Sequence, residues 1–253
     1  MPFCCLLKTL FLITGLMMSA QSTFAAIDYH QRAEQIRANA PSIQVENYTA
    51  QNIDGWPVYL SNQLLKENPE RMARVKLMLK QQMERVKNAL PADIVTRLQD
   101  VPIWISPTYE GTGPKAEYHP GAGWLKANGR HPQLVKCVEI TNTQIFEKEI
   151  RRMPVLLLHE LAHAYHDQVL GFQHSEVKAA YEAAKEKGIY EQVALRANGK
   201  LVRSYALTNE REYFAELTES YFGINDFYPV NREELQQHDP HMAKLLPKLW
   251  GVE

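Results

Sequence analysis

The segment HELAH at positions 159–163 places two histidines four residues apart, with a glutamate directly after the first. In a helix, residues four apart lie on one face, so the imidazoles of His159 and His163 can bind the same metal ion. Glu160 then points beside the ion, where its carboxylate can accept a proton from a metal-bound water. An apolar run over 154–158 leads into the segment and indicates a buried helix, which favours a genuine metal site over a chance match.

A catalytic zinc ion needs a third protein ligand and one open position. One known arrangement has a glycine three residues and a histidine six residues after the second histidine of the motif. Those positions hold His166 and Val169, so this arrangement is excluded. We expect His166 to lie on the surface or beside the ligands rather than to act as a fourth ligand.

A downstream helix predicted over 209–222 offers a glutamate as the third ligand. Asn209 can cap this helix, with Glu212 reaching back to the cap. Glu212, Glu216 and Glu219 share one face, which adjoins an apolar face. Three such carboxylates repel one another unless a cation offsets them. A solvated acidic face is the alternative, and helix geometry alone does not separate the two.

Two stretches resemble the catalytic domain of anthrax lethal factor and the secreted Pro-Pro endopeptidases, which are gluzincin-type zinc peptidases. One is HELAHAYHD at 159–167, and the other is TNEREYFAE at 208–216, preceded by Tyr205. The resemblance covers residues 154–223, about a quarter of the chain. The whole chain is also similar to uncharacterised bacterial exported proteins that carry HELAHAYHD and EYFAE segments, which adds nothing about a substrate.

The resemblance implies a role for each matching residue. His159, His163 and Glu212 would bind Zn²⁺, and Glu160 would be the general base. Tyr205 would donate a hydrogen bond to the developing oxyanion.

Two further carboxylates lie within reach of this set. The resemblance implies that Glu216 is a supporting or substitute carboxylate. Asp167 lies four residues after His163, where a carboxylate either orients a ligand imidazole or lies on the helix surface. The sequence does not decide whether Glu216 or His166 contacts the metal.

The elements predicted around the site give an α+β fold. A hairpin, a long amphipathic helix and three short strands precede the HELAH helix, and the third strand is a candidate edge strand for pairing with an extended substrate. The resemblance implies a zincin-like fold, with a small mixed sheet packed on several helices that include the HELAH helix and the downstream glutamate helix. The predicted strands cover 45–60 (the hairpin), 101–105, 117–119 and 135–140, and the predicted helices cover 69–90, 154–170, 175–187, 209–222 and parts of 231–250.

The first residues differ in composition from the rest of the chain. Lys8 is the only charged residue before Asp28, and an apolar run over 10–18 is followed by small residues up to Ala25. This pattern predicts a signal peptide over 1–25, followed by a single domain over 26–253. A membrane anchor is the alternative, but the run is shorter than the ~20 residues that a span needs. We therefore expect a secreted or periplasmic protein without stable membrane association after cleavage.

Charge and cysteine content exclude one class of function and one kind of stabilising bond. The net charge is -1, so the basic excess typical of nucleic-acid binding is absent. Cleavage of the signal peptide would leave Cys137 as the only cysteine, so the mature chain could form no internal disulfide.

These patterns predict a zinc metallopeptidase that hydrolyses protein or peptide substrates, with Glu160 activating a zinc-bound water. The alternatives are a catalytically silent zincin-fold binding protein and a metal-dependent amidase acting on cell-wall peptides. Glu160 and Tyr205 favour hydrolysis over silent binding, because neither is needed merely to hold a metal. The sequence gives neither the substrate preference nor the oligomeric state.

Overall fold

The computed structural model describes residues 47–113, 115–141 and 143–252, and in this part of the chain the protein is α+β. The predicted signal peptide over 1–25 lies outside the described residues. Among the described helices, none combines the length and the apolar character needed to cross a membrane.

The elements alternate between short strands and helices in the amino-terminal half and are mainly helical after residue 146. The strands are β1 (Tyr48–Ile53), β2 (Trp56–Ser61), β3 (Ile103–Ile105), β4 (Ala116–Tyr118), β5 (Val138–Ile140), β6 (Val193–Ala194) and β7 (Leu201–Val202). The α-helices are α2 (Asn62–Glu67), α3 (Pro69–Ala89), α4 (Ala92–Leu98), α5 (Ala122–Ala127), α6 (Phe146–Arg152), α7 (Leu156–Tyr165), α8 (Ser175–Lys187), α9 (Glu210–Phe222), α10 (Arg232–His238) and α11 (Pro240–Trp250). Shorter helical turns are η1 (Pro132–Leu134), the π-helical η2 (His166–Leu170) and η3 (Tyr205–Leu207).

The main sheet is mixed, with the strand order β1-β2-β3-β5-β4. Strands β2, β3 and β5 run parallel, whereas β1 and β4 are antiparallel to their neighbours. Val138 in β5 pairs with Ile103 on one side and with Tyr118 on the other. The prediction that the strand over 135–140 is an edge strand is therefore wrong, because β5 is an interior strand and β4 forms the edge.

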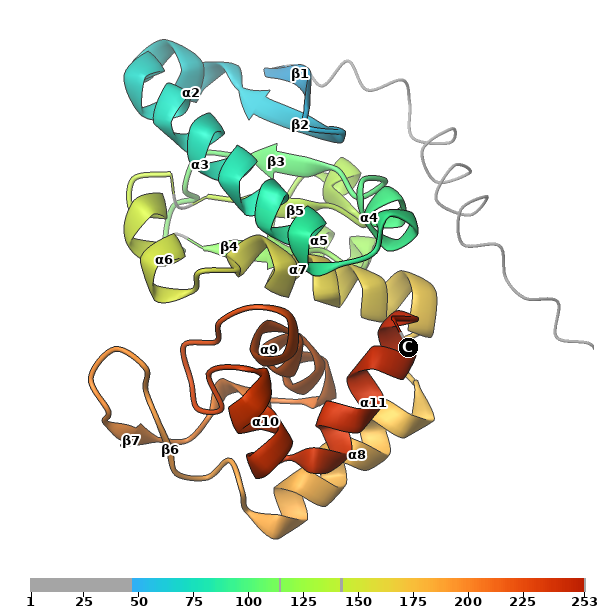
Figure 1. The fold of residues 1–253 in the computed structure, drawn as a ribbon. Helices are drawn as coiled ribbons and strands as arrows, with labels where there is room; N and C mark the ends of the chain where they lie inside the picture. Colours follow the sequence, from blue (N-terminus) through green and yellow to red (C-terminus); the bar gives the residue numbers. More distant parts are fainter. Residues whose placement is uncertain (1–46, 114, 142, 253) are drawn as a thin grey trace, which may run out of the picture.

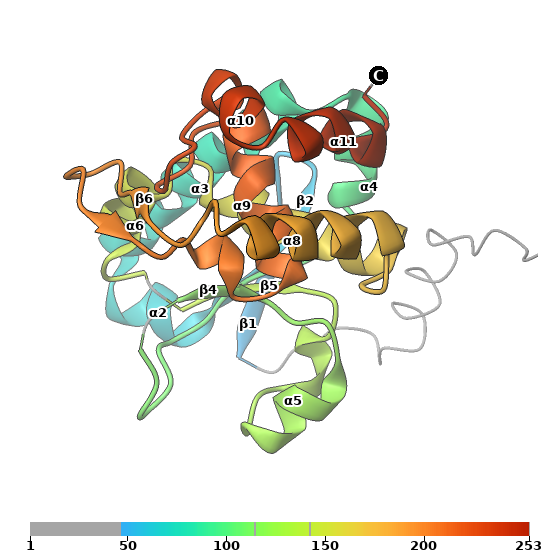
Figure 2. The ribbon, with the colours of Figure 1, turned by 90° about the horizontal axis from the view of Figure 1, so that it is seen from below.

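The two faces of this sheet are covered by different elements. On one face, side chains from β2, β3 and β5 join the apolar stripe of α3 and the buried residues of α7 in the main core. On the other face, Tyr59 and Trp104 pack with Leu125 of α5, Leu134 of η1 and Cys137. Figure 2 shows α5 and α3 on opposite sides of the sheet. Cys137 is thus a buried core thiol, as its apolar surroundings predict.

Helix α7 lies at the centre of the molecule, between the sheet and the carboxy-terminal helices α8–α11 (Figure 1). All of its residues except His163 are buried, which explains why its sequence is apolar on nearly every side. The prediction of one regular helix over 154–170 is only partly right. The α-helical turns end at Tyr165, and the chain continues as the π-helical turn η2 before Gly171, whose φ of 80° ends the helix.

Helices α7 and α9 are closely packed, and a glycine makes this possible at one end. A Cβ atom on Gly223, directly after α9, would lie 2.7 Å from Val155 Cγ1, directly before α7. Real Cβ atoms do not approach other atoms so closely, so a side chain at position 223 would push the two helices apart. This contact helps to fix the spacing across which the site residues of the two helices meet.

Candidate metal centre and cleft

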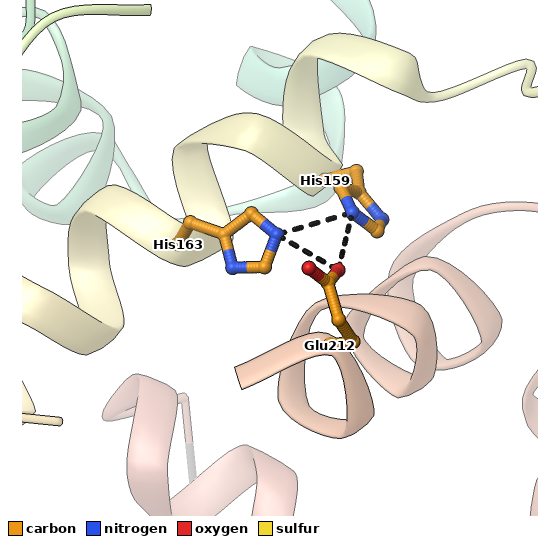
Figure 3. A group of neighbouring side chains, drawn as sticks. All are labelled: His159, His163 and Glu212. Atoms are coloured by element: carbon orange, nitrogen blue, oxygen red, sulfur yellow. Dashed lines mark hydrogen bonds and ion pairs between the residues drawn. The ribbon is translucent and has the colours of Figure 1, made fainter. Parts of the chain in front are cut away.

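The two histidines of α7 and a glutamate of α9 converge on one point (Figure 3). Oε2 of Glu212 lies 3.1 Å from Nε2 of His163 and 3.3 Å from Nε2 of His159, and the two nitrogens are 3.2 Å apart. A tetrahedral zinc ion with bonds of about 2.0–2.1 Å separates neighbouring ligand atoms by about 3.3 Å. The three atoms therefore have the spacing that one shared zinc ion requires.

The environment of Glu212 also fits a metal ligand. Its Oε2 atom is buried and makes no well-aligned hydrogen bond within the described chain, although both imidazoles are close. Burial would raise the pKa of Glu212, but the contacts with His159 and His163 outweigh burial and lower it well below its usual range. Glu212 is therefore an anion, and one of its oxygens lacks a hydrogen-bond donor. Both properties suit a carboxylate that binds a metal.

The other side of the His159 ring is held by a carboxylate that the sequence analysis did not assign to the site. Nδ1 of His159 lies 2.7 Å from Oε1 of Glu219, whereas Oε1 of Glu216 is 4.0 Å away. A hydrogen bond at Nδ1 leaves Nε2 free to face a metal and fixes the ring orientation. Glu219, one turn further along α9, therefore has the supporting role at His159 that was expected for Glu216.

Glu216 and Glu219 are both buried against α7. Burial raises the pKa of Glu219 to about 7, and burial together with the charge of Glu219 raises the pKa of Glu216 well above its ordinary value. Burial alone would lower the pKa of His159, but its close contact with the Glu212 carboxylate and its hydrogen bond with Glu219 raise it well above its ordinary value.

The start of α9 sets the position of Glu212. The side chain of Asn209 accepts hydrogen bonds from the backbone N–H groups of Arg211 and Glu212, at 2.9 and 3.0 Å, so Asn209 caps the helix as predicted. The side chain of Glu212 is directed at the two histidines, so the expectation that it reaches back to the cap is wrong.

Glu160 is 7% exposed and is held by the edge strand. The backbone N–H of Tyr118 in β4 donates a hydrogen bond of 2.9 Å to Oε2 of Glu160. In an antiparallel edge strand, alternate residues direct their backbone groups away from the sheet. The neighbours Lys115 and His119 make backbone bonds towards β5, so Ala116 and Tyr118 face outward. The sequence carries no signal for such a backbone contact.

Tyr205 lies in η3, directly before α9, and is 47% exposed at the mouth of the site. Its hydroxyl donates a long hydrogen bond of 3.5 Å to Oε1 of Glu212. Partial burial, followed by the charge of Glu212, raises the pKa of Tyr205, so the phenol stays protonated at neutral pH. The hydroxyl is therefore a donor beside the three converging atoms, as the sequence prediction requires.

Asp167 does not contact the histidines in the way that its spacing from His163 suggests. Its Oδ2 atom accepts a hydrogen bond of 2.7 Å from the Tyr118 hydroxyl and forms a close ion pair with Lys136. Asp167 is the second residue of the π-helical turn η2, where the regular four-residue spacing of an α-helix no longer applies. Asp167 therefore fastens η2 to the β4–β5 segment instead of orienting an imidazole.

His166 is fully buried between Phe172 and Phe214, and neither ring nitrogen has a hydrogen-bond partner among the described residues. Burial lowers its pKa to about 3, which keeps the ring neutral. His166 is a core residue beside α9, and the three converging ligand atoms come from other side chains.

A cavity of about 530 Å³ opens onto the converging side chains. Its walls come from β4, from α7 and the segment after it, and from the start of α9. The lining includes Glu117, Tyr118, Glu160, Phe172, Tyr205 and Arg211. The cavity is thus open beside the point on which the three ligand atoms converge.

A second cluster, beside strands β4 and β5, joins a histidine to two carboxylates. Atoms of Glu117, His119 and Glu139 lie within 4.8 Å of one another. Glu139 is fully buried and accepts from His119 at 3.0 Å and from Tyr109 at 2.6 Å. Arg130 lies 3.5 Å from each of the two glutamates. An arginine therefore already supplies the positive charge in this cluster.

Comparison with protein-family models found no match, and comparisons with curated proteins and with solved structures found no similar protein. The function is therefore inferred from the site itself.

Proposed function

We propose that the protein is an exported zinc-dependent metallopeptidase with a zincin-like arrangement of sheet and helices. The observation that carries the proposal is the convergence of His159, His163 and Glu212, with ligand atoms 3.1–3.3 Å apart, at the base of an open cleft. Glu160 and Tyr205 line the same cleft as these residues, which supports their proposed roles as general base and oxyanion donor. Export is proposed from the composition of residues 1–25 alone.

Bound zinc would supply Lewis-acid activation of a water molecule and of the scissile carbonyl. Glu160 would accept the proton of that water and deliver it to the leaving amine. The Tyr118 N–H keeps the Glu160 carboxylate at one position before the reaction begins. Tyr205 would exchange its long bond with Glu212 for a bond to the oxygen that becomes negative.

The outward-facing backbone of strand β4 supports the proposal that the substrate is a peptide. Ala116 directs its backbone groups away from the sheet and lines the cleft, so an extended peptide could add to the edge at this residue. Pairing of this kind recognises backbone and fits hydrolysis of a peptide bond.

The test combines metal analysis with cleavage assays on the mature protein. We expect one zinc ion per chain, and cleavage of casein or of a peptide library that a chelator abolishes and added zinc restores. Glu160→Ala should keep its zinc and lose roughly 100- to 10,000-fold in kcat. Tyr205→Phe should keep its zinc and lose roughly 100-fold or more in kcat.

If wild type and Glu160→Ala behave alike on every substrate, the silent zincin-fold protein is the better description. If zinc remains bound at full occupancy in Glu212→Ala, the ligand set is wrong.

A further inference from the structure

Three positively charged side chains line the cleft in the described chain, and two of them have carboxylate partners. Lys115 pairs with Glu117 at 2.6 Å. Arg152 pairs with Glu149 at 2.9 Å and with Asp226 at 2.6 Å. Arg211 makes no ion pair with any described carboxylate, and its guanidinium makes no hydrogen bond to the described residues. Its five N–H donors are therefore available to a ligand in the cleft.

Arg211 is held in place by an aromatic ring rather than by a counter-charge. Its guanidinium carbon lies 4.1 Å from the centroid of the Phe172 ring, and Phe172 lines the same cleft. Stacking on a ring restricts the long side chain and leaves the edge of the guanidinium open for hydrogen bonds. The side chain is only partly exposed, so a carboxylate bound there would be partly shielded from water.

The position of Arg211 near the start of α9 is electrostatically unfavourable for the helix. It is the second residue of α9, in the first turn, where the helix dipole favours negative groups and opposes a cation. The neighbouring acidic residues Glu210 and Glu212 follow that rule. A cation that works against the dipole and lacks an internal partner is better explained by a bound anion.

The distance from the zinc position limits where that anion lies on a substrate. Arg211 directly precedes Glu212, so their Cα atoms are about 3.8 Å apart. A substrate residue in extended conformation spans about 3.3 Å. Because Arg211 and Glu212 also line the same cleft, an anionic group held by Arg211 would belong to a residue a few positions from the scissile bond, and the three positions on each side are the ones to test.

We infer that Arg211 makes the cleft selective for peptides that carry a carboxylate within three residues of the cleaved bond. This inference rests on the proposed peptidase function and names its substrate class. The carboxylate is either an aspartate or glutamate side chain or the free carboxy terminus of a short peptide. The planar guanidinium would bind it through two parallel hydrogen bonds.

The first experiment measures kcat/KM for a series of fluorogenic peptides. A single Glu is moved through the three positions on each side of the scissile bond, with Gln at the same position as its uncharged counterpart. A second pair of peptides differs only in a free or an amidated carboxy terminus. For wild type we expect one position, or the free terminus, to give a preference of about 10-fold or more.

Arg211→Gln should reduce that preference to about 1, and Arg211→Lys should leave an intermediate value because charge remains without the planar fork. Arg232→Gln is the matched control. Arg232 is also stacked on a ring, at 4.2 Å from the centroid of Tyr221, but lies outside the cleft. This control should keep the wild-type preference. Zinc content and thermal unfolding verify that each variant is folded.

A binding measurement separates this inference from the proposed function. Fluorescence anisotropy of the Glu and Gln peptides with zinc-loaded Glu160→Ala, with and without Arg211→Gln, reports recognition without turnover. A preference for Glu that disappears with Arg211→Gln supports the inference even if no peptide is cleaved. Cleavage or binding with equal values for the Glu and Gln peptides and for the two termini overturns the inference and leaves the peptidase function standing.

Discussion

Two clusters of histidine and carboxylate side chains adjoin strand β4, and their charges are balanced in different ways. In the cluster around His159, one oxygen of Glu212 is buried without a well-aligned hydrogen bond, and no arginine or lysine forms an ion pair with its carboxylates in the described chain. In the cluster around Glu139, Arg130 lies within 3.5 Å of both glutamates, and both oxygens of Glu139 have partners. Spacing between ligand atoms is suitable for a metal in both places.

The difference shows that proximity of histidine and carboxylate groups does not by itself define a metal site. A cluster that contains its own cation and satisfies its hydrogen bonds is complete as a structural element. A cluster with an unsatisfied anion facing an open cleft can accept a cation from outside, as we propose for the cluster around His159. Four changes test whether the two clusters differ in this way.

The largest effect is expected for Glu212→Gln. Removing the anionic ligand should weaken zinc binding on the order of 1,000-fold, because one of three protein ligands loses its charge. Competition with a chromophoric chelator measures the affinity, and metal analysis measures the stoichiometry. Circular dichroism shows whether the fold persists. Unchanged zinc affinity in a folded variant would remove the distinction between the two clusters.

Glu139→Gln should instead affect stability. The buried guanidinium of Arg130 would lose its fully buried partner, and the free energy of unfolding should fall by about 3 kcal/mol, as for other broken buried pairs. Urea unfolding at neutral pH measures this change. Zinc affinity should equal that of wild type, and a loss comparable to that of Glu212→Gln would mean that the second cluster also binds metal.

The pH dependence of stability sharpens this test. Burial would raise the pKa of Glu139, but hydrogen bonds from His119, Ser106 and Tyr109 outweigh burial and lower it below its ordinary value of 4.5. A lowered folded-state pKa means that the contribution is fully present above pH 4.5 and is lost as the pH falls through the folded pKa. The stability difference between wild type and Glu139→Gln should therefore shrink in acid. A difference that grows below pH 4.5 would contradict the sign of the shift.

A smaller effect is expected for Glu219→Gln, which replaces the carboxylate on Nδ1 of His159. Carboxylates that orient ligand histidines typically contribute 10- to 100-fold to metal affinity or activity, and we expect a loss of roughly 10-fold in zinc affinity. Glu216→Gln is the matched control, because Oε1 of Glu216 lies 4.0 Å from the same nitrogen. Equal losses in the two variants would show that general burial of charge matters more than the hydrogen bond.

The smallest effect is expected for Asp167→Asn, which weakens the link from η2 to Tyr118 and Lys136. Zinc affinity should not change, whereas kcat/KM should fall by less than about 10-fold because the strand that holds Glu160 becomes less fixed. Hydrogen exchange at the Tyr118 amide should become faster. A fall in zinc affinity would instead return Asp167 to the role that its spacing from His163 suggested.

Much of the fold follows from local patterns in the sequence. The hairpin predicted over 45–60 and the helices predicted over 69–90 and 175–187 are present as β1–β2, α3 and α8. Turn residues, caps and helical periodicity act over a few residues, as at the Asp54-Gly55 turn, the Asn68 cap of α3 and Gly188 after α8. The order of the three-residue strands β3, β4 and β5 could not be predicted in this way. Which of them lies at the edge depends on pairing between distant segments.

The same contrast between local patterns and contacts across the fold applies to the site. The convergence of His159, His163 and Glu212 could be predicted because four-residue spacing fixes a helix face and because the resemblance supplied the partner helix. The contacts of Asp167 with Tyr118 and Lys136 could not be predicted, because a π-helical turn has no clear sequence signal. Glu219 was left out because its position on the shared face fits a solvated carboxylate as well as one that holds His159.

The hydrogen bond from the Tyr118 amide to Glu160 also has a consequence for self-association. An open sheet edge presents unpaired amides and carbonyls that can template pairing with another chain. Here the outward amide of Tyr118 already donates its hydrogen bond to Glu160. A second copy of the protein could therefore form fewer backbone hydrogen bonds with this edge. The same contact that fixes the carboxylate therefore also leaves one amide fewer for a second chain to pair with.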